Sequence, residues 1–129
     1  MRGVPHYRSN QRVEITDITR IGTIDTVTMM GRVDSDTAGT LEKTLTDLMS
    51  AGSKEIVCDF SSTTYISSAG LRVLLSVTKT LVRSQGRIVL CSLRPNVALV
   101  FTIAGFNQIM KIYPTRDAAI KVLAGDSGP

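Results

Sequence analysis

The hydrophobic period changes repeatedly along this sequence, and this alternation constrains the fold more than any other feature. Two segments rich in β-branched residues, 13–18 and 24–30, stand on either side of the polar sequence TRIGT. Two such runs joined by a short glycine-containing segment predict a β-hairpin. Beyond residue 33, segments with apolar residues at helical spacing alternate with short, continuous apolar runs. This alternation is typical of an α/β fold in which a helix follows each strand.

The first helical segment starts after the sequence MMGRVDSD. Its apolar residues recur every three or four positions, at Ala38, Leu41, Leu45 and Leu48. This spacing places them on one face of a helix. We expect Asp34, Ser35 or Asp36 to cap the helix at its start and Gly52 to end it.

The remaining segments continue the alternation. In order they are the strand EIVCDF, a polar serine-rich turn, a helix that ends at SQG (84–86), the strand RIVLCSL, a helix from Pro95 to Gly105, the strand QIMKIYP, and a helix capped by Thr115. Helical crossovers produce parallel strands, and the opening hairpin adds one antiparallel edge. We therefore expect a single α/β domain with a mixed, mostly parallel sheet of about five strands and about four helices.

Length and composition fit one domain. The 129 residues, of which 43% are hydrophobic and 20% charged, suffice for one continuous core and not for two. We expect a flexible basic leader (1–11), a folded domain (12–124) and a flexible tail (125–129). No apolar run approaches the roughly 18 residues that span a bilayer, and the first residues do not resemble a secretory signal. We expect a cytoplasmic protein without membrane insertion.

The net charge of +4 is too dispersed to indicate nucleic-acid binding. Half of the excess lies in residues 1–20, which hold Arg2, Arg8, Arg12 and Arg20 against Glu14 and Asp17. The rest of the chain is mixed in sign and has neither a basic run nor aromatic residues interleaved with basic ones. We expect no direct contact with nucleic acid.

Two cysteines, Cys58 and Cys91, each lie within an apolar, strand-like run. Such a pair can come close together in a sheet, but buried thiols that act as small hydrophobic residues are the favoured interpretation for a cytosolic protein. Two cysteines and the single histidine, His6, do not provide a metal site. We expect no metal and no other cofactor.

The sequence TTYISSAGLRVLL (63–75) passes from a polar turn through two serines into an apolar helical segment. A hydrolase places its nucleophilic serine at a strand-to-helix turn of this kind, between two glycines. Gly70 stands two residues after Ser68, but Ile66 occupies the position of the other glycine, and the only histidine is His6 in the leader. Because no fixed base is available to activate the serine, we do not expect hydrolysis.

Two other functions suit serines at the start of a helix. A phosphate-binding loop uses the free amide groups of a helix N-terminus, but SSAGL has one glycine and no lysine, so it lacks the parts that hold a nucleoside triphosphate. Alternatively, a kinase modifies an exposed serine here, and the helix N-terminus stabilises the added charge. Taken alone, the residues favour a plain helix cap, although one serine can cap the helix while its neighbour is modified.

The sequence resembles the STAS domains, a family named for sulfate transporters and anti-sigma factor antagonists. The similarity extends from about residue 13 to about residue 113 and includes GRVD (31–34), VCDFSSTTYISSAGL (57–71), GRIVLCSL (86–93) and VFTIAGFNQIMKIY (100–113). The second of these segments is the specific signature of the family. The others follow in the family's order and spacing.

The resemblance implies a phosphorylation site. The phosphoacceptor in the family is the serine two residues before the glycine of SAGL, which makes Ser68 the acceptor and Gly70 that glycine. Many family members have aspartate directly before the acceptor, where this chain has Ser67. Ser67 therefore lacks the negative charge of that aspartate and is the alternative acceptor.

Four more residues match the family pattern or lie near the acceptor. Asp34 matches an acidic residue in the loop after the second strand, which the resemblance places near the acceptor. Asp59 and Ser61 match an Asp-x-Ser ending of the next strand. Ordinary structural roles are equally open, as a helix cap for Asp34 and as turn formers for the other two. Arg72, one turn after Ser68, either contacts the phosphate or an acidic patch on the partner, or belongs to a solvated basic stripe.

The resemblance implies a regulatory protein that catalyses no reaction. The expected function is that of an anti-sigma factor antagonist, which binds an anti-sigma factor serine kinase while Ser68 is unphosphorylated and so frees a sigma factor. Phosphorylation ends that complex, because a doubly charged group in a packed interface meets desolvation and like-charge repulsion. A PP2C-type phosphatase restores the binding form. The alternative is a STAS scaffold or ligand-sensing module of another bacterial signalling complex that does not act on sigma.

Overall fold

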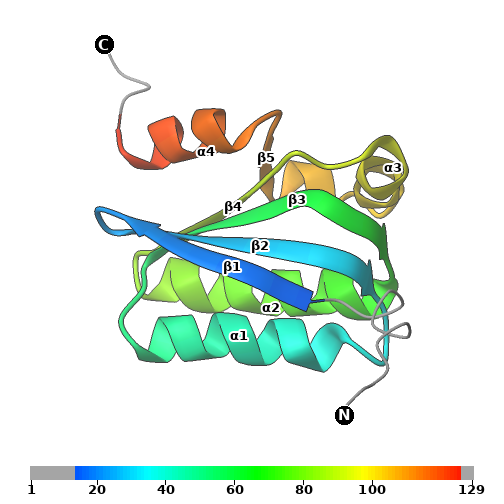
Figure 1. Cartoon of the computed structure of the whole chain (residues 1–129), viewed down its shortest axis with the longest axis horizontal. Helices are drawn as coiled ribbons and strands as arrows, with labels where there is room; N and C mark the ends of the chain where they lie inside the picture. Colours follow the sequence, from blue (N-terminus) through cyan, green and yellow to red (C-terminus); the bar gives the residue numbers. More distant parts are fainter. Residues whose placement is uncertain (1–13, 126–129) are drawn as a thin grey trace.

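Strands and helices alternate after an opening hairpin in the computed structural model, which describes residues 14–125 (Figure 1). The elements are β1 (Glu14–Ile21), β2 (Ile24–Val33), α1 (Ala38–Ser50), β3 (Glu55–Ile66), α2 (Ser68–Arg83), β4 (Arg87–Cys91), α3 (Pro95–Ile103), the 3-10 helix η2 (Phe106–Gln108), β5 (Lys111–Tyr113) and α4 (Arg116–Leu123). The predicted order of strands and helices is confirmed. The predicted leader (1–11) and residues 126–129 of the predicted tail lie outside the described residues.

The five strands form one sheet in the order β1-β2-β3-β4-β5. β1 is antiparallel to β2, and the other neighbouring strands are parallel. Each parallel neighbour follows a helix, which carries the chain back to the edge where the next strand starts. The mixed, mostly parallel sheet predicted from the sequence is confirmed.

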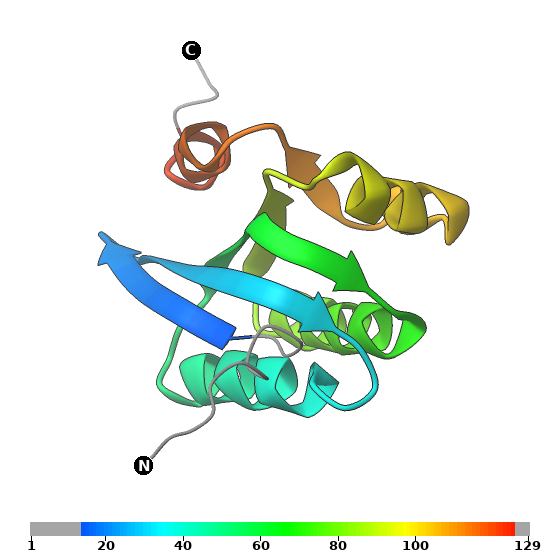
Figure 2. The ribbon, with the colours of Figure 1, turned by 45° about the vertical axis from the view of Figure 1, so that its right-hand side comes forward.

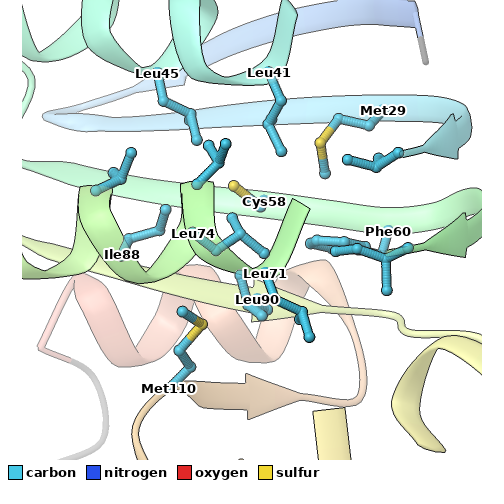
Figure 3. Packing of buried hydrophobic residues seen from close by; sticks show 14 of the residues in the cluster. Met29, Leu41, Leu45, Cys58, Phe60, Leu71, Leu74, Ile88, Leu90 and Met110 are labelled. Atoms are coloured by element: carbon cyan, nitrogen blue, oxygen red, sulfur yellow. The ribbon is translucent and has the colours of Figure 1, made fainter. Parts of the chain in front are cut away.

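Helices cover both faces of the sheet. α1 and α2 lie side by side on one face, and α3 and α4 lie on the other (Figures 1 and 2). The larger hydrophobic cluster packs α1 and α2 against the sheet and also contains Val97 and Phe101 of α3. Its other residues include Met29, Leu41, Leu45, Cys58, Phe60, Leu71, Leu74, Ile88, Leu90 and Met110 (Figure 3). A smaller cluster beneath α4 contains Ile24, Val57, Val89, Cys91, Ala119 and Leu123.

The two cysteines belong to different clusters. Cys58 lies in the cluster beneath α1 and α2, whereas Cys91 lies in the cluster beneath α4. Cys91 pairs with Asp59, the residue after Cys58, and successive residues of a strand point to opposite faces. The two thiols therefore face opposite sides of the sheet, and both are free and buried, as the sequence favoured.

The strand β3 is longer than the sequence indicated. Residues 63–65 were expected to form a polar turn, but β3 continues to Ile66 and pairs with the second half of β2. Thr63 is fully buried, and its hydroxyl donates a hydrogen bond to the carbonyl of Met29 at 3.3 Å. Pairing with a long neighbouring strand satisfies these polar residues and overrides their local preference for a turn.

The last strand is shorter than its sequence pattern. Residues 108–114 were expected to form a strand, but β5 contains only Lys111–Tyr113 and pairs with the last three residues of β4. Gly105, with a φ of 76°, follows the end of α3 as expected and is the N-cap residue of η2. The amide of Met110 donates to the carbonyl of Phe106 at 2.9 Å, and this tight turn brings Met110 into the core.

Candidate functional site

The predicted phosphorylation site lies where β2 and β3 end together. Val33, the last residue of β2, pairs with Ile66, the last residue of β3. The backbone N–H of Ser67 then donates a hydrogen bond to the carbonyl of Val33 at 2.8 Å. This bond extends the pairing by one residue, so the loop that begins at Asp34 lies beside the start of α2. The structure brings Asp34 and the two serines to one edge of the sheet.

The two serines have different environments. Ser68 is the first residue of α2 and is exposed. Ser67 occupies the N-cap position with extended backbone (φ −103°, ψ 176°), but its side chain makes no capping hydrogen bond. The hydroxyl oxygen of Ser67 is buried without a hydrogen-bond partner among the described residues. A serine therefore occupies the cap position, as the sequence favoured, but its side chain does not cap the helix, and the first amide groups of α2 have no side-chain acceptor.

Gly70 brings the first turn of α2 close to the ends of both strands. It is buried, and a Cβ atom at this position would lie 2.7 Å from Cγ1 of Val33 and 2.8 Å from Cγ1 of Ile66. These separations are shorter than any normal contact between carbon atoms, which is about 3.5 Å or more. Only glycine allows α2 to start this near the sheet. This packing fixes the position of Ser68 at the surface.

Asp34 stabilises the loop after β2 rather than capping α1. Its carboxylate accepts the N–H of Asp36 at 3.0 Å, and its carbonyl accepts the N–H groups of Thr37 and Ala38. The N-cap residue of α1 is Thr37, not Asp34, Ser35 or Asp36 as predicted. The helix starts later because the Thr37 hydroxyl accepts the N–H of Asp34 at 2.9 Å, which closes a separate turn before it.

The Asp34 carboxyl is held in its charged form. Desolvation acts to raise its pKa, but hydrogen bonds from Asp36 and Thr37, together with the charge of Arg32, outweigh desolvation and lower the pKa below its usual value. A group whose pKa is lowered from an ordinary value near 3.8 is ionised at neutral pH. The predicted acceptor Ser68 therefore has a permanent negative charge in the neighbouring loop.

Arg32 connects this loop to Tyr65 of β3. Its Nε atom lies 3.6 Å from Oδ2 of Asp34, and its guanidinium lies over the ring of Tyr65, 4.2 Å from the centroid. Tyr65 is the residue paired with Arg32 across β2 and β3. A cation over an aromatic face is attracted by the ring quadrupole, so the guanidinium has two partners, the carboxylate of Asp34 and the ring of Tyr65.

The structure separates Asp59 and Ser61 from Ser68. Asp59 lies seven residues before Ile66 in β3, and at about 3.3 Å per residue this places it roughly 20 Å from the end of the strand. Its buried carboxylate pairs with Arg116 of α4 at 2.9 Å and accepts the N–H of Ser61 at 2.9 Å. These contacts attach α4 to the sheet and shape a bulge within β3.

Arg72 lies one turn after Ser68 and is exposed on a groove between α1 and α2. The groove has a volume of about 510 Å³ and is lined by Glu42, Ala69, Arg72, Val73, Leu75, Ser76 and Lys79. No carboxylate of the described residues forms an ion pair with Arg72. Its position on the α1 side of α2 suits contact with another molecule that enters the groove.

A family model for the STAS domain matches residues 16–119. The chain belongs to the STAS domain family. A protein of Bordetella bronchiseptica that carries the name anti-sigma factor antagonist BtrV is 44% identical over 91 residues, which cover 70% of this STAS domain protein and 78% of that relative.

Solved structures share the fold of this STAS domain. An anti-sigma factor antagonist from Mycobacterium paratuberculosis matches it with a TM-score of 0.78 and 21% identity, over 85% of this chain and 92% of that chain. The phosphorylated form of SpoIIAA, a cell fate determinant of Bacillus, matches with a TM-score of 0.65 and 18% identity, over 83% of this chain and 97% of that chain. At these identities the similarity establishes the fold alone.

Charge is segregated along the STAS domain. Between Asp59 and Asp117 the sequence contains no acidic residue. This stretch includes α2, whose exposed surface carries the basic residues Arg72, Lys79 and Arg83. Among the described residues, none of the three takes part in an ion pair. The helix that begins with Ser68 therefore presents uncompensated positive charge.

Two residues of the STAS domain were missed by sequence reasoning. Arg32 is the middle of GRVD and stands two residues before Asp34, which places both side chains on one side of an extended strand. That spacing was a usable signal. Arg116 gave no such signal, because its partner Asp59 is distant in the sequence and only the docking of α4 joins them.

The described residues 14–125 hold no group of three or more histidine, cysteine, aspartate or glutamate side chains that could bind a metal ion. None of the helices in this range is long and apolar enough to cross a membrane.

Proposed function

We propose that this STAS domain is an anti-sigma factor antagonist whose binding to an anti-sigma factor is switched by phosphorylation of Ser68. The observation that carries the proposal is the exposed hydroxyl of Ser68 at the first position of α2, next to amide groups that no side chain caps. The name of the relative that is 44% identical supports the same function. The protein acts by binding and catalyses no reaction.

The uncapped start of α2 suits a serine that gains a phosphate. The phosphate adds about 1.5 to 2 negative charges, and the free amide groups and the dipole at a helix N-terminus favour negative charge there. The hydroxyl of Ser68 is at the surface, whereas the hydroxyl oxygen of Ser67 is buried. A kinase reaches the first without unfolding the helix, which supports Ser68 over Ser67 as the acceptor.

The same edge suits a partner that leaves when the phosphate is added. The positive surface of α2 attracts an acidic surface on the anti-sigma factor, and complementary charge of this kind mainly speeds encounter. A phosphate at Ser68 repels that acidic surface and adds to the charge of Asp34. A loss of about 2.8 kcal/mol in binding free energy weakens the complex about a hundredfold.

The proposed cycle needs two enzymes, both in the cytoplasm. The anti-sigma factor is itself a serine kinase that modifies Ser68, and a PP2C-type phosphatase removes the phosphate. The sigma factor is free while the unphosphorylated STAS domain occupies its anti-sigma factor.

Phosphorylation and binding are tested with the purified protein and candidate anti-sigma factor serine kinases of the same organism. Incubation with ATP followed by peptide mass spectrometry is expected to locate one phosphate on Ser68. Ser67→Ala is the matched control and is expected to leave the reaction unchanged, whereas Ser68→Ala abolishes it. Isothermal titration calorimetry is expected to show tight binding by Ser68→Ala and at least tenfold weaker binding by Ser68→Asp.

Two outcomes would overturn the proposal. The first is phosphorylation at another residue, or at none, with a kinase that binds the protein. The second is equal affinity of the Ser68→Ala and Ser68→Asp variants for the anti-sigma factor. Equal affinities would favour the alternative, a STAS scaffold or ligand-sensing module that does not act on sigma.

A further inference from the structure

The guanidinium of Arg32 is held in place by two neighbours, but its hydrogen-bond donors are not all used. It lies between the carboxylate of Asp34, at 3.6 Å, and the ring of Tyr65, at 4.2 Å from the centroid. A charge-assisted hydrogen bond from nitrogen to oxygen is about 2.8 Å long, so the contact with Asp34 is a loose ion pair. The side chain of Arg32 remains 43% exposed, and none of its five N–H donors makes a closer hydrogen bond to another of the described residues.

Arg32 belongs to the same sheet edge as Ser68. Its partner across the strands is Tyr65, three residues before Ser68, and the hydrogen bond between Ser67 and Val33 holds the two chains together beyond that point. Neighbouring strands are about 4.8 Å apart. Val33 and Ile66 contact Gly70 of α2, so Arg32 and Tyr65, one residue earlier in each strand, face the opposite side of the sheet. Both strands end one residue after this pair, and a long arginine side chain that extends toward Asp34 passes the ends of the strands, beyond which α2 starts.

Arg72 is the competing cation. It follows Ser68 by four residues in α2, and side chains at this spacing are neighbours on a helix. However, Arg72 lines the groove between α1 and α2, together with Glu42. That direction leads toward α1, whereas Arg32 and Asp34 lie toward the ends of the strands. Arg32 also lies beside the carboxylate of Asp34. A phosphate on Ser68 adds further negative charge near that carboxylate, which increases the attraction for the guanidinium.

We propose that Arg32 is the counter-ion of the phosphate on Ser68 and that it leaves the ring of Tyr65 when the phosphate is added. This inference rests on the proposed modification of Ser68 and identifies the residue that binds the added phosphate. The phosphate carries more charge than Asp34 and offers three acceptor oxygens, so it is the stronger partner for a planar guanidinium. Arg32 moves toward the phosphate, which reduces the repulsion between the phosphate and Asp34.

Movement of Arg32 would make phosphorylation change the protein surface at Tyr65 as well as at Ser68. In the unphosphorylated form the guanidinium covers one face of Tyr65, a residue that is 37% exposed. In the phosphorylated form that face of the ring is uncovered. Phosphorylation thus changes two surfaces at once, the start of α2 and the ends of β2 and β3.

The experiment uses the full chain with phosphoserine placed at position 68 during translation by an expanded genetic code. This step needs no kinase, so the result is independent of whether the proposed kinase acts. A ³¹P NMR titration measures the second pKa of the phosphate, which is about 6 for free phosphoserine. Because a nearby cation favours the dianion, Arg32→Gln is expected to raise this pKa by about half a unit or more.

Arg72→Gln is the matched control and is expected to shift the phosphate pKa by less than about 0.2 unit, because its exposed side chain lines the groove toward α1 and its charge is screened by solvent. Arg32→Lys retains the cation and is expected to restore most of the lowered value. In a second readout, the ring protons of Tyr65 are expected to change chemical shift between serine and phosphoserine at position 68, and this change is expected to vanish in Arg32→Gln.

Two results would overturn the proposal. A shift in Arg72→Gln with none in Arg32→Gln would assign the phosphate to Arg72. Unchanged Tyr65 resonances on phosphorylation would show that Arg32 stays on the ring. Circular dichroism of each variant verifies the fold, and Arg32→Lys keeps the test informative if Arg32→Gln is unstable. Failure of the kinase reaction would instead contradict the proposed function and leave this result standing.

Discussion

The backbone N–H of Ser67 donates a hydrogen bond to the carbonyl of Val33 at 2.8 Å. This single bond joins the end of β3 to the end of β2 at the point where α2 begins. It turns the side chain of Ser67 inward and leaves Ser68 at the surface. The site therefore depends on how two strands end together and on Gly70, which packs against both ends.

Replacing Gly70 by alanine is expected to destabilise the protein. The new Cβ would lie 2.7 Å from Val33 and 2.8 Å from Ile66, and overpacking of this kind costs about 1–3 kcal/mol in free energy of unfolding. Gly39→Ala is the control, because Gly39 is an exposed helical residue with nothing within 4 Å of the added atom. It is expected to stabilise by about 0.5–1 kcal/mol. Urea unfolding measures both, and equal effects would contradict the packing role of Gly70.

Removing the hydroxyl of Ser67 is expected to leave stability unchanged or to raise it slightly. The hydroxyl is buried without a partner, and loss of such a group costs nothing in hydrogen bonding. Thr115→Ala is the contrasting variant, because its side chain accepts the N–H of Ala118 at 3.1 Å as the cap of α4. That change is expected to cost about 1 kcal/mol. A similar loss in Ser67→Ala, measured by thermal unfolding, would show that Ser67 does cap α2.

Two substitutions of Asp34 distinguish the contribution of its turn hydrogen bond to stability from the contribution of its charge. Asp34→Asn keeps an oxygen for the N–H of Asp36 and is expected to lose at pH 7 only the contribution of the charge, whereas Asp34→Ala also loses that hydrogen bond and is expected to be the less stable of the two variants in urea unfolding.

The pH dependence of the same residue has a definite sign. Because the pKa of Asp34 is lowered on folding, its contribution to stability is present above the ordinary value of 3.8 and is lost as the pH falls through the lowered value. Urea unfolding between pH 2 and pH 7 is expected to show a smaller acid-side loss in Asp34→Asn. An identical pH profile in the two proteins would contradict this origin.

Breaking the contact between Asp59 and Arg116 is expected to destabilise the protein without changing partner affinity. Arg116→Met leaves the carboxylate of Asp59, only 5% exposed, without its cation. The cost for a fully buried pair is about 3–5 kcal/mol, and the partial exposure of Arg116 reduces it to about 2 kcal/mol. Lys43→Ala breaks an exposed pair with Asp47 and is expected to cost less than about 0.5 kcal/mol. A tenfold weaker anti-sigma complex in folded Arg116→Met would place Asp59 in the binding surface.

Neither cysteine is expected to react in the folded protein. Burial raises the pKa of Cys91 to about 11 and raises that of Cys58 further, and only the thiolate reacts with a disulfide reagent. Ellman's reagent at pH 8 is expected to label no thiol in the native state and two in urea. Oxidation is expected to form no bond between them, since they face opposite sides of the sheet. Labelling of native protein within minutes would contradict their burial.

The raised cysteine pKa values also act on stability at high pH. The folded state keeps these thiols protonated where the unfolded chain, with an ordinary value near 9.0, has begun to lose the protons. The contribution is complete below about pH 9 and is lost as the pH rises through the folded value near 11. Cys91→Ala is expected to flatten the loss of stability between pH 9 and pH 10.5 in urea unfolding.

Local patterns predicted most of the elements because their causes are local. Helical spacing from Ala38 to Leu48, the cap at Thr115 and the stop at Gly105 each depend on residues within a few positions, and all three are confirmed. The end of β3 and the cap of α1 were wrong because both depend on β2. The burial of Thr63 and the separate turn at Asp34 arise only when β2 lies beside them.

The sequence by itself determined that small hydroxyl residues and a glycine stand where a strand leads into a helix. The hydrophobic period and the spacing of the family motif both depend only on the order of the residues. It did not distinguish the surroundings of the two serines, which have the same side chain. Only the tertiary structure decided that Ser67 is turned inward and Ser68 outward, because the hydrogen bond to Val33 and the contact of Gly70 with two strand ends fix the direction in which α2 starts. The neighbours of that hydroxyl, Asp34 and Arg32, were likewise decided by the pairing of β2 with β3.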